Sequence, residues 1–123
     1  MTITEFLLAR IAEDEEDARE ASAGRRWSWD EDGECLLSDA LGQYALHECI
    51  IDTEGANPPE ATTAGAHIAR WDPARVLAEC EAKRRIVEHC EPDALTKSPG
   101  DEYMLRLLAS VYVDHHDYDE AWR

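Results

Sequence analysis

Apolar residues recur at helical spacing over the first twenty positions of the chain. Those that fall on one helical face are Ile3, Phe6, Leu7, Ile11, Ala18 and Ala21. Thr2 and Glu5 have the Thr-x-x-Glu spacing of a capping box. The pattern predicts a helix over residues 3–21, with the acidic run E-D-E-E-D at 13–17 mostly on its solvated side.

Short apolar stretches separated by turn signals come next. The stretches 27–29 and 35–37 flank Asp32-Gly33, a dipeptide typical of a tight hairpin turn. A third stretch, 44–51, fits a strand, but Ala45, Leu46 and Glu48 also favour a helix. We predict a small antiparallel sheet and leave strand or helix open for 44–51.

Proline and glycine divide the second half of the chain. Gly, Asn and two prolines predict a loop over 52–61, and helical composition begins at 62. Asp72 is a predicted N-cap and Pro73 the first residue of a helix to about Cys90. Residues 98–101 predict a turn before a last helix over 102–112.

Together these elements predict an α+β fold in a single domain over residues 1–123. It would have an acidic N-terminal helix, a small antiparallel sheet and two main helices packed on the sheet. There is no run of about 18 apolar residues, and the N-terminus does not have the pattern of a signal peptide. We therefore expect a cytoplasmic protein. Its four cysteines show no C-x-x-C spacing and predict no disulfide framework.

The charge of the chain says most about which partners to expect. The net charge is −16, and residues 1–60 alone carry 16 acids and 4 bases, a net of −12. Such a field repels nucleic acid and anionic membranes but attracts a basic protein surface. High negative charge also serves solubility alone.

Candidate partner-binding residues follow from this charge and from the tryptophans. They are Glu13, Asp14, Glu16 and Asp17 in the acidic run, with Trp27 and Trp29 as aromatic anchors. The two tryptophans share one face of a strand, so covering the small core is the competing explanation.

One block and one ending carry a resemblance. The block at 67–77 is H-I-A-R-W-D-P-A-R-V-L, and the ending from Tyr112 is Y-V-D-H-H-D-Y-D-E-A-W. They resemble an uncharacterised family of small acidic proteins from actinobacteria and their phages, and more loosely Ea22-type phage accessory proteins. The resemblance implies an α+β accessory domain with no activity that can be carried over. The motif residues, for which we expect structural roles, are His67, Arg70, Asp72, Pro73, Arg75, Asp114, His115 and Trp122.

The histidines and cysteines raise two kinds of chemistry, a metal site and acid–base catalysis. Structural zinc sites usually have paired ligands two to four residues apart, twice over, whereas here most pairs are adjacent, as in His89-Cys90 and His115-His116. We expect no metal and no cofactor. A hydrolase using His115 with Asp114 or Asp117 is an alternative, although a solvated turn explains these residues more simply. A small-molecule-binding protein with a pocket between sheet and helices is a second alternative.

These observations favour a non-catalytic accessory or interaction protein that presents an acidic surface to a basic protein partner. No direct contact with nucleic acid or membrane is expected, and homodimerisation is left open. Tyr118 and Trp122 would dock the C-terminal residues onto the helices, because an aromatic tail is costly to leave in water.

Overall fold

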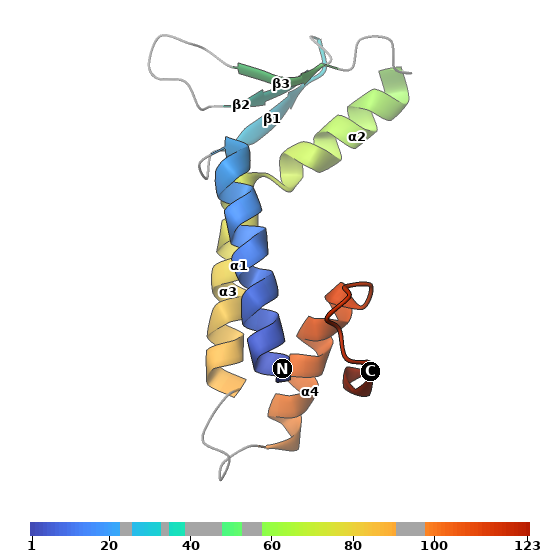
Figure 1. Cartoon of the computed structure of the whole chain (residues 1–123). Coiled ribbons are helices and arrows are strands. Elements are labelled where there is room, and N and C mark those ends of the chain that lie inside the picture. The colour runs from blue at the N-terminus through green and yellow to red at the C-terminus, as the bar shows by residue number, and fades with distance from the viewer. Residues whose placement is uncertain (23–25, 33–34, 39–47, 53–57, 91–97) are drawn as a thin grey trace. The chain divides into compact units, whose positions relative to one another are not determined.

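The structure is a computed structural model that describes residues 1–22, 26–32, 35–38, 48–52, 58–90 and 98–123. Its elements make an α+β fold, as predicted (Figure 1). By its internal contacts the chain divides into two compact units. Unit 1 comprises residues 1–15 and 79–123, and unit 2 comprises residues 16–78. The prediction of a single folding domain stays a prediction.

Helix α1, Ile3–Ser22, begins at the predicted capping box. The Thr2 backbone N–H donates to Glu5 Oε2 at 2.7 Å, and the Glu5 N–H donates to Thr2 Oγ1 at 3.1 Å. These bonds, that from the Thr2 backbone first, lower the pKa of the Glu5 carboxyl. The predicted apolar face is buried at Phe6, Leu7 and Ile11, among others, but Ala21 is exposed.

Unit 2 contains an antiparallel sheet of three strands in the order β1-β2-β3 (Figure 1). The strands are β1, Trp27–Asp30, β2, Cys35–Ser38, and β3, Glu48–Asp52. Trp27 pairs with Ser38 and Asp30 with Cys35, and the β2–β3 pairing shifts register after Leu36. The strand alternative is therefore confirmed for 48–52, whereas residues 44–47 and Gly33 of the predicted turn lie outside the described residues.

Helix α2, Pro58–Arg70, starts earlier than predicted. Residues 58–61 were expected in a loop because of their two prolines, and that prediction was wrong. A proline in the first turn of a helix loses no hydrogen bond, since the first N–H groups have no intrahelical partner. Asp52, also predicted as loop, ends β3.

Within unit 2, α2 is the helix that lies against β1 and β2, although the prediction did not count it among the two main helices. Its Gly65 is buried directly beneath the Trp29 indole, where an added Cβ would overlap the ring. The absence of a side chain at this position is what lets the helix approach the strand.

Helix α3, Pro73–Cys90, has the predicted cap. Asp72 Oδ1 accepts from the Arg75 N–H at 2.9 Å, and Asp72 Oδ2 accepts from the Trp27 N–H at 3.2 Å. Further along the helix, in unit 1, Cys80 and Cys90 are buried free thiols whose pKa values are raised by that burial. They therefore act as small apolar core residues.

Helix α4, Pro99–Ala109, also begins earlier than predicted. The predicted turn at 98–101 is the helix start. Ser98 Oγ accepts from the Asp101 N–H, and Asp101 Oδ2 accepts from the Ser98 N–H. Two short 3₁₀ helices follow, η1, Ser110–Tyr112, and η2, Glu120–Trp122. Within the part of the chain that the structure describes, none of the helices combines the length and apolar character needed to cross a membrane.

Candidate functional site

The C-terminal segment packs over one side chain of the first helix. Phe6 is fully buried, and four later rings surround it. The distances from its ring centroid are 6.2 Å to Tyr112, 5.8 Å to His115, 6.0 Å to Tyr118 and 5.0 Å to Trp122. The predicted docking of the aromatic C-terminal residues is confirmed, and His115 and Trp122 are part of it.

Arg10 lies beside this aromatic cluster with only 8% of its side chain exposed. Its Nη2 donates to Glu13 Oε1 at 2.7 Å, and its Nη1 lies 3.7 Å from Asp117 Oδ2. Its Nη1 also contacts both ring nitrogens of His115, and its guanidinium lies over the Phe6 ring. A buried charge needs such partners, so Glu13 and Asp117 compensate Arg10. Arg10 Nε has no hydrogen-bond partner among the described residues.

Two donors lie against one ring nitrogen of His115, Nδ1. Arg10 approaches its ring, and the Asp117 backbone N–H donates to His115 Nδ1 at 3.1 Å. A ring nitrogen that accepts these bonds is not available to take a proton from a substrate. Within the described chain no serine or cysteine hydrogen-bonds to His115, and Asp114 is exposed. This geometry gives no support to the hydrolase alternative.

His115, His116 and Asp117 do meet one geometric condition for binding a metal. One ligand atom from each lies within 4.8 Å of the others, and the two imidazole rings stack with centroids 4.3 Å apart. Their adjacency in the sequence counted against a metal site, but the turn after η1 brings the two rings together. Arg10 occupies the ring nitrogens of His115, so a metal ion would have to displace a buried cation.

Tyr112 binds the acidic run directly. Its hydroxyl donates to Asp14 Oδ2 at 2.6 Å, and burial together with this bond raises the pKa of the phenol. The neighbouring Glu15 pairs with Arg84 of α3 at 2.9 Å. Part of the acidic run thus holds unit 1 together, which the sequence did not reveal because the partners are far along the chain.

The remaining acids of α1 form an exposed row, here called the acidic stripe. Its members are Glu13, Glu16, Asp17 and Glu20. They occur at positions i, i+3, i+4 and i+7, so they lie on one helix face. Glu13 pairs with Arg10 but keeps 59% of its side chain exposed, whereas Glu16, Asp17 and Glu20 make no ion pair with a described residue. Three of the four predicted acidic candidates, Glu13, Glu16 and Asp17, belong to the stripe.

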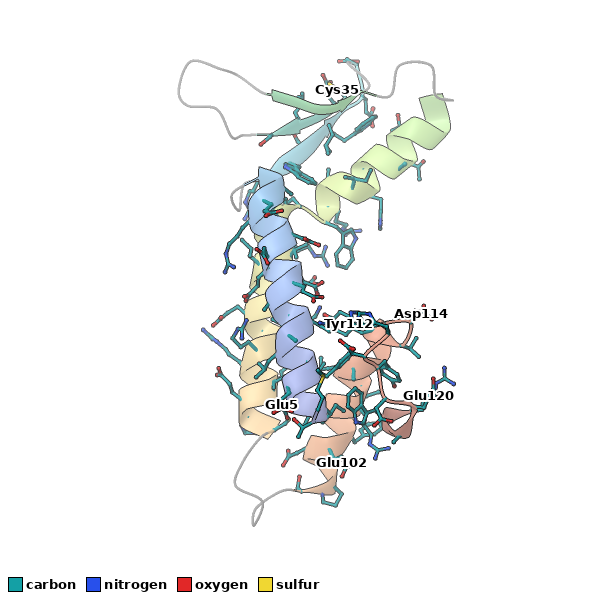
Figure 2. All side chains as sticks on the ribbon, viewed as in Figure 1. Glu5, Cys35, Glu102, Tyr112, Asp114 and Glu120 are labelled. Carbon is teal, nitrogen blue, oxygen red and sulfur yellow. The ribbon has the colours of Figure 1, made fainter. Side chains whose placement is uncertain are left out.

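A hollow of about 440 Å³ lies between α4 and the C-terminal segment, here called the α4 hollow. Its lining is mostly apolar and consists of Tyr103, Arg106, Leu107, Ser110, Val113, Tyr118, Trp122 and Arg123. Figure 2 shows Glu102 on α4, with Asp114 and Glu120 on the segment that follows it. The sequence did not reveal the hollow, because its lining comes from α4 and from the segment that ends at Arg123.

A second, polar hollow of about 470 Å³ lies in unit 2 and includes part of the block at 67–77. It is lined by Arg26, Trp27, Ala69, Arg70, Asp72, Ala74, Arg75 and Ala78. Three arginines therefore meet around the Asp72 cap. The Arg75 guanidinium stacks 4.1 Å from the Trp71 ring centroid, and the His67 ring lies 6.3 Å from it. Asp72 and Pro73 begin α3, so these motif residues take part in its structure.

The two tryptophans of β1 have different surroundings, and both are half-buried. Trp29 packs on Gly65, and its Nε1 has no hydrogen-bond partner among the described residues. Trp27 lines the polar hollow. Trp29 thus helps to cover the sheet–helix contact, while Trp27 stays a candidate for partner binding.

The fold and the aromatic cluster define a small acidic α+β protein whose C-terminal segment is fastened over its first helix. The chain belongs to a family of unknown function, DUF6221, whose model matches residues 1–123. Membership of an uncharacterised family is thereby confirmed. No curated protein and no solved structure matches the chain.

Proposed function

We propose that the protein is a non-catalytic accessory protein that binds a basic protein partner through the acidic stripe. The observation that carries the proposal is the stripe itself. Glu16, Asp17 and Glu20 are exposed on one face of α1, and no described cation pairs with them. A basic surface would supply counter-charges to these carboxylates. Electrostatic steering would also raise the rate at which the two proteins associate.

The stripe has an energetic cost that solubility alone does not explain. Four like-charged pairs at i,i+3 or i,i+4 spacing each destabilise a helix by about 0.2–0.5 kcal/mol, or roughly 1–2 kcal/mol together. The same four charges spread over the surface would serve solubility without this cost. Their concentration on one face favours recognition.

The spacing of the stripe also suits a nucleic-acid mimic. Seven residues of α-helix rise about 10.5 Å, so four charges have a mean axial spacing of about 3.5 Å. This is close to the roughly 3.4 Å per phosphate along one strand of duplex DNA. A protein that normally binds nucleic acid is one form the basic partner would take. The looser phage resemblance would make that partner a host protein.

A charge-neutralising triple variant tests the proposal. Glu16→Gln, Asp17→Asn and Glu20→Gln remove three charges but keep Glu13, which Arg10 needs. The matched control, Glu31→Gln, Glu81→Gln and Glu88→Gln, removes three exposed charges elsewhere. Partners captured at about 50 mM salt and reconstituted from pure proteins should bind wild type and control but not the triple variant.

Salt dependence provides the decisive readout. The affinity of the reconstituted pair should fall steeply between about 50 and 500 mM salt, since exposed charges are screened over that range. Binding of equal strength at both concentrations, or equal loss in the triple variant and its control, would contradict the proposal. The small-molecule alternative expected a pocket between sheet and helices, whereas the α4 hollow, of a volume typical of ligand pockets, lies between α4 and the C-terminal segment.

A further inference from the structure

Helix α4 and the η1 turn that follows it leave a row of large apolar side chains in solvent. The exposed fractions are 62% for Tyr103, 43% for Met104, 49% for Leu107 and 68% for Val111. Positions 103, 107 and 111 are four residues apart, so they form one strip about 12 Å long on a face other than that of buried Leu105. Exposed apolar side chains that lie in a continuous row, rather than singly, are typical of interaction surfaces.

The strip is continuous with the α4 hollow. Tyr103 and Leu107 belong to both, and the hollow extends from them to Val113, Tyr118 and Trp122. The combined surface is therefore an apolar track with a depression beside it. Contacts with a helix that inserts anchor side chains at i, i+3 or i+4, and i+7 have this length and form.

The charges around this surface indicate which kind of partner segment it would bind. Five carboxylates lie next to lining residues in sequence or pair with them, namely Glu102, Asp114, Asp117, Asp119 and Glu120. Three guanidinium groups accompany them, those of Arg106, Arg123 and the buried Arg10, and each has a carboxylate partner, which for Arg10 is Asp117 at 3.7 Å. Arg106 pairs with Glu102 at 2.7 Å, and Arg123 pairs with Glu120 at 3.1 Å. With all three guanidinium groups counted, the rim has a net charge of −2, so it repels an anionic amphiphile or a second copy with the same rim.

We propose that the α4 strip and hollow bind a basic amphipathic helix of the partner protein. Its apolar anchors would seat in the hollow and along Leu107 and Val111. Its lysines or arginines would face the carboxylates of the rim. The proposal rests on the proposed function, because it names the kind of segment through which the basic partner binds. The α4 surface would contribute apolar burial to the binding free energy, which salt does not screen. The acidic stripe would contribute electrostatic attraction, which salt does screen.

Two synthetic peptides of equal charge test this. One, of about 18 residues, is an amphipathic helix of Leu and Lys, and the other has the same composition in an order without an apolar face. Calorimetry should show that the amphipathic peptide binds the full chain at least tenfold more tightly. Leu107→Ser should weaken it about tenfold, because about half a leucine side chain's burial is lost. Val111→Ser, at a more exposed position, should act in the same direction without altering the fold.

Controls separate this proposal from the proposed function. Trp71→Ser removes an exposed apolar side chain in unit 2 and should leave peptide affinity unchanged. If both peptides bind with equal affinity and Leu107→Ser does not change that affinity, the α4 proposal is wrong, but binding of a basic partner to an acidic surface remains supported. If neither peptide binds wild type, both fail. A dimer that Leu107→Ser dissociates, or a retained small molecule that it releases in native mass spectrometry, would also overturn the α4 proposal.

Discussion

Phe6 is the only phenylalanine of the chain, and it organises the aromatic contacts of unit 1. Sequence periodicity correctly placed it on a buried helix face. Periodicity could not identify its partners, because Tyr112 and Trp122 approach it from the far end of the chain. The same holds for Arg10, whose burial depends on His115 and Asp117.

Tyr112→Phe should make the protein less sensitive to alkali. The pKa of Tyr112 is raised in the folded state, so the unfolded chain loses this proton first as the pH rises past about 10. The raised pKa of Tyr112 therefore contributes fully to the free energy of unfolding below about pH 10, and this contribution is progressively lost as the pH rises further. Near neutral pH, loss of the bond to Asp14 should lower the free energy of unfolding by about 1–2 kcal/mol.

Urea unfolding at about pH 8 and pH 11 measures both effects. The wild type should lose more stability between the two pH values than Tyr112→Phe. Tyr103→Phe is the matched control, because Tyr103 is exposed and should keep the wild-type response. An equal alkaline loss in wild type and Tyr112→Phe would show that the phenol of Tyr112 does not couple to folding.

At the level of elements, the local sequence predicted which segments form helices and strands better than it predicted the residues at which the helices begin. Capping signals at Thr2 and Asp72 predicted two helix starts correctly. The prolines at 58–59 and Pro99 predict a loop and a turn, yet they begin α2 and α4. Proline suits both a turn and the first turn of a helix, and only the residues that follow decide between them.

Gly65→Ala should destabilise unit 2 although alanine is the better helix former. In an exposed helix the exchange would stabilise by about 1 kcal/mol. Here the new methyl group would overlap the Trp29 indole, so the melting temperature should fall. Gly100→Ala is the control, because its Cβ would lie 3.7 Å from Ser98 Oγ, an ordinary contact, and should not lower the melting temperature. A rise in both variants would show that β1 and α2 separate readily.

Across the whole molecule, the charge of −16 opposes folding by self-repulsion. Composition predicted this field, but not its division into internal pairs, such as Glu15 with Arg84, and the exposed acidic stripe. That division depends on which helix faces meet, information that local sequence does not contain. The α4 hollow was missed for the same reason, since its walls come from α4 and from the segment ending at Arg123.

Neutral salt should therefore stabilise the protein. Between about 50 and 500 mM NaCl, screening of like charges should raise the free energy of unfolding by on the order of 1 kcal/mol. Chemical unfolding at the two concentrations measures this. The rise should be smaller in the variant with Glu16→Gln, Asp17→Asn and Glu20→Gln, which relieves part of the repulsion beforehand. A fall in stability with salt would mean that attractive ion pairs dominate the electrostatics.

The contacts of Phe6 and Arg10 also determine when the protein can finish folding. Arg10 and His115 are 105 residues apart, so this face of α1 has no cover from η1 and the C-terminal segment until nearly all of the chain exists. At roughly 5–20 residues per second, a nascent α1 waits on the order of ten seconds for these partners. Closing so long a loop also makes this step late in refolding. Unit 1 is thus the part of the protein most exposed to aggregation during its synthesis.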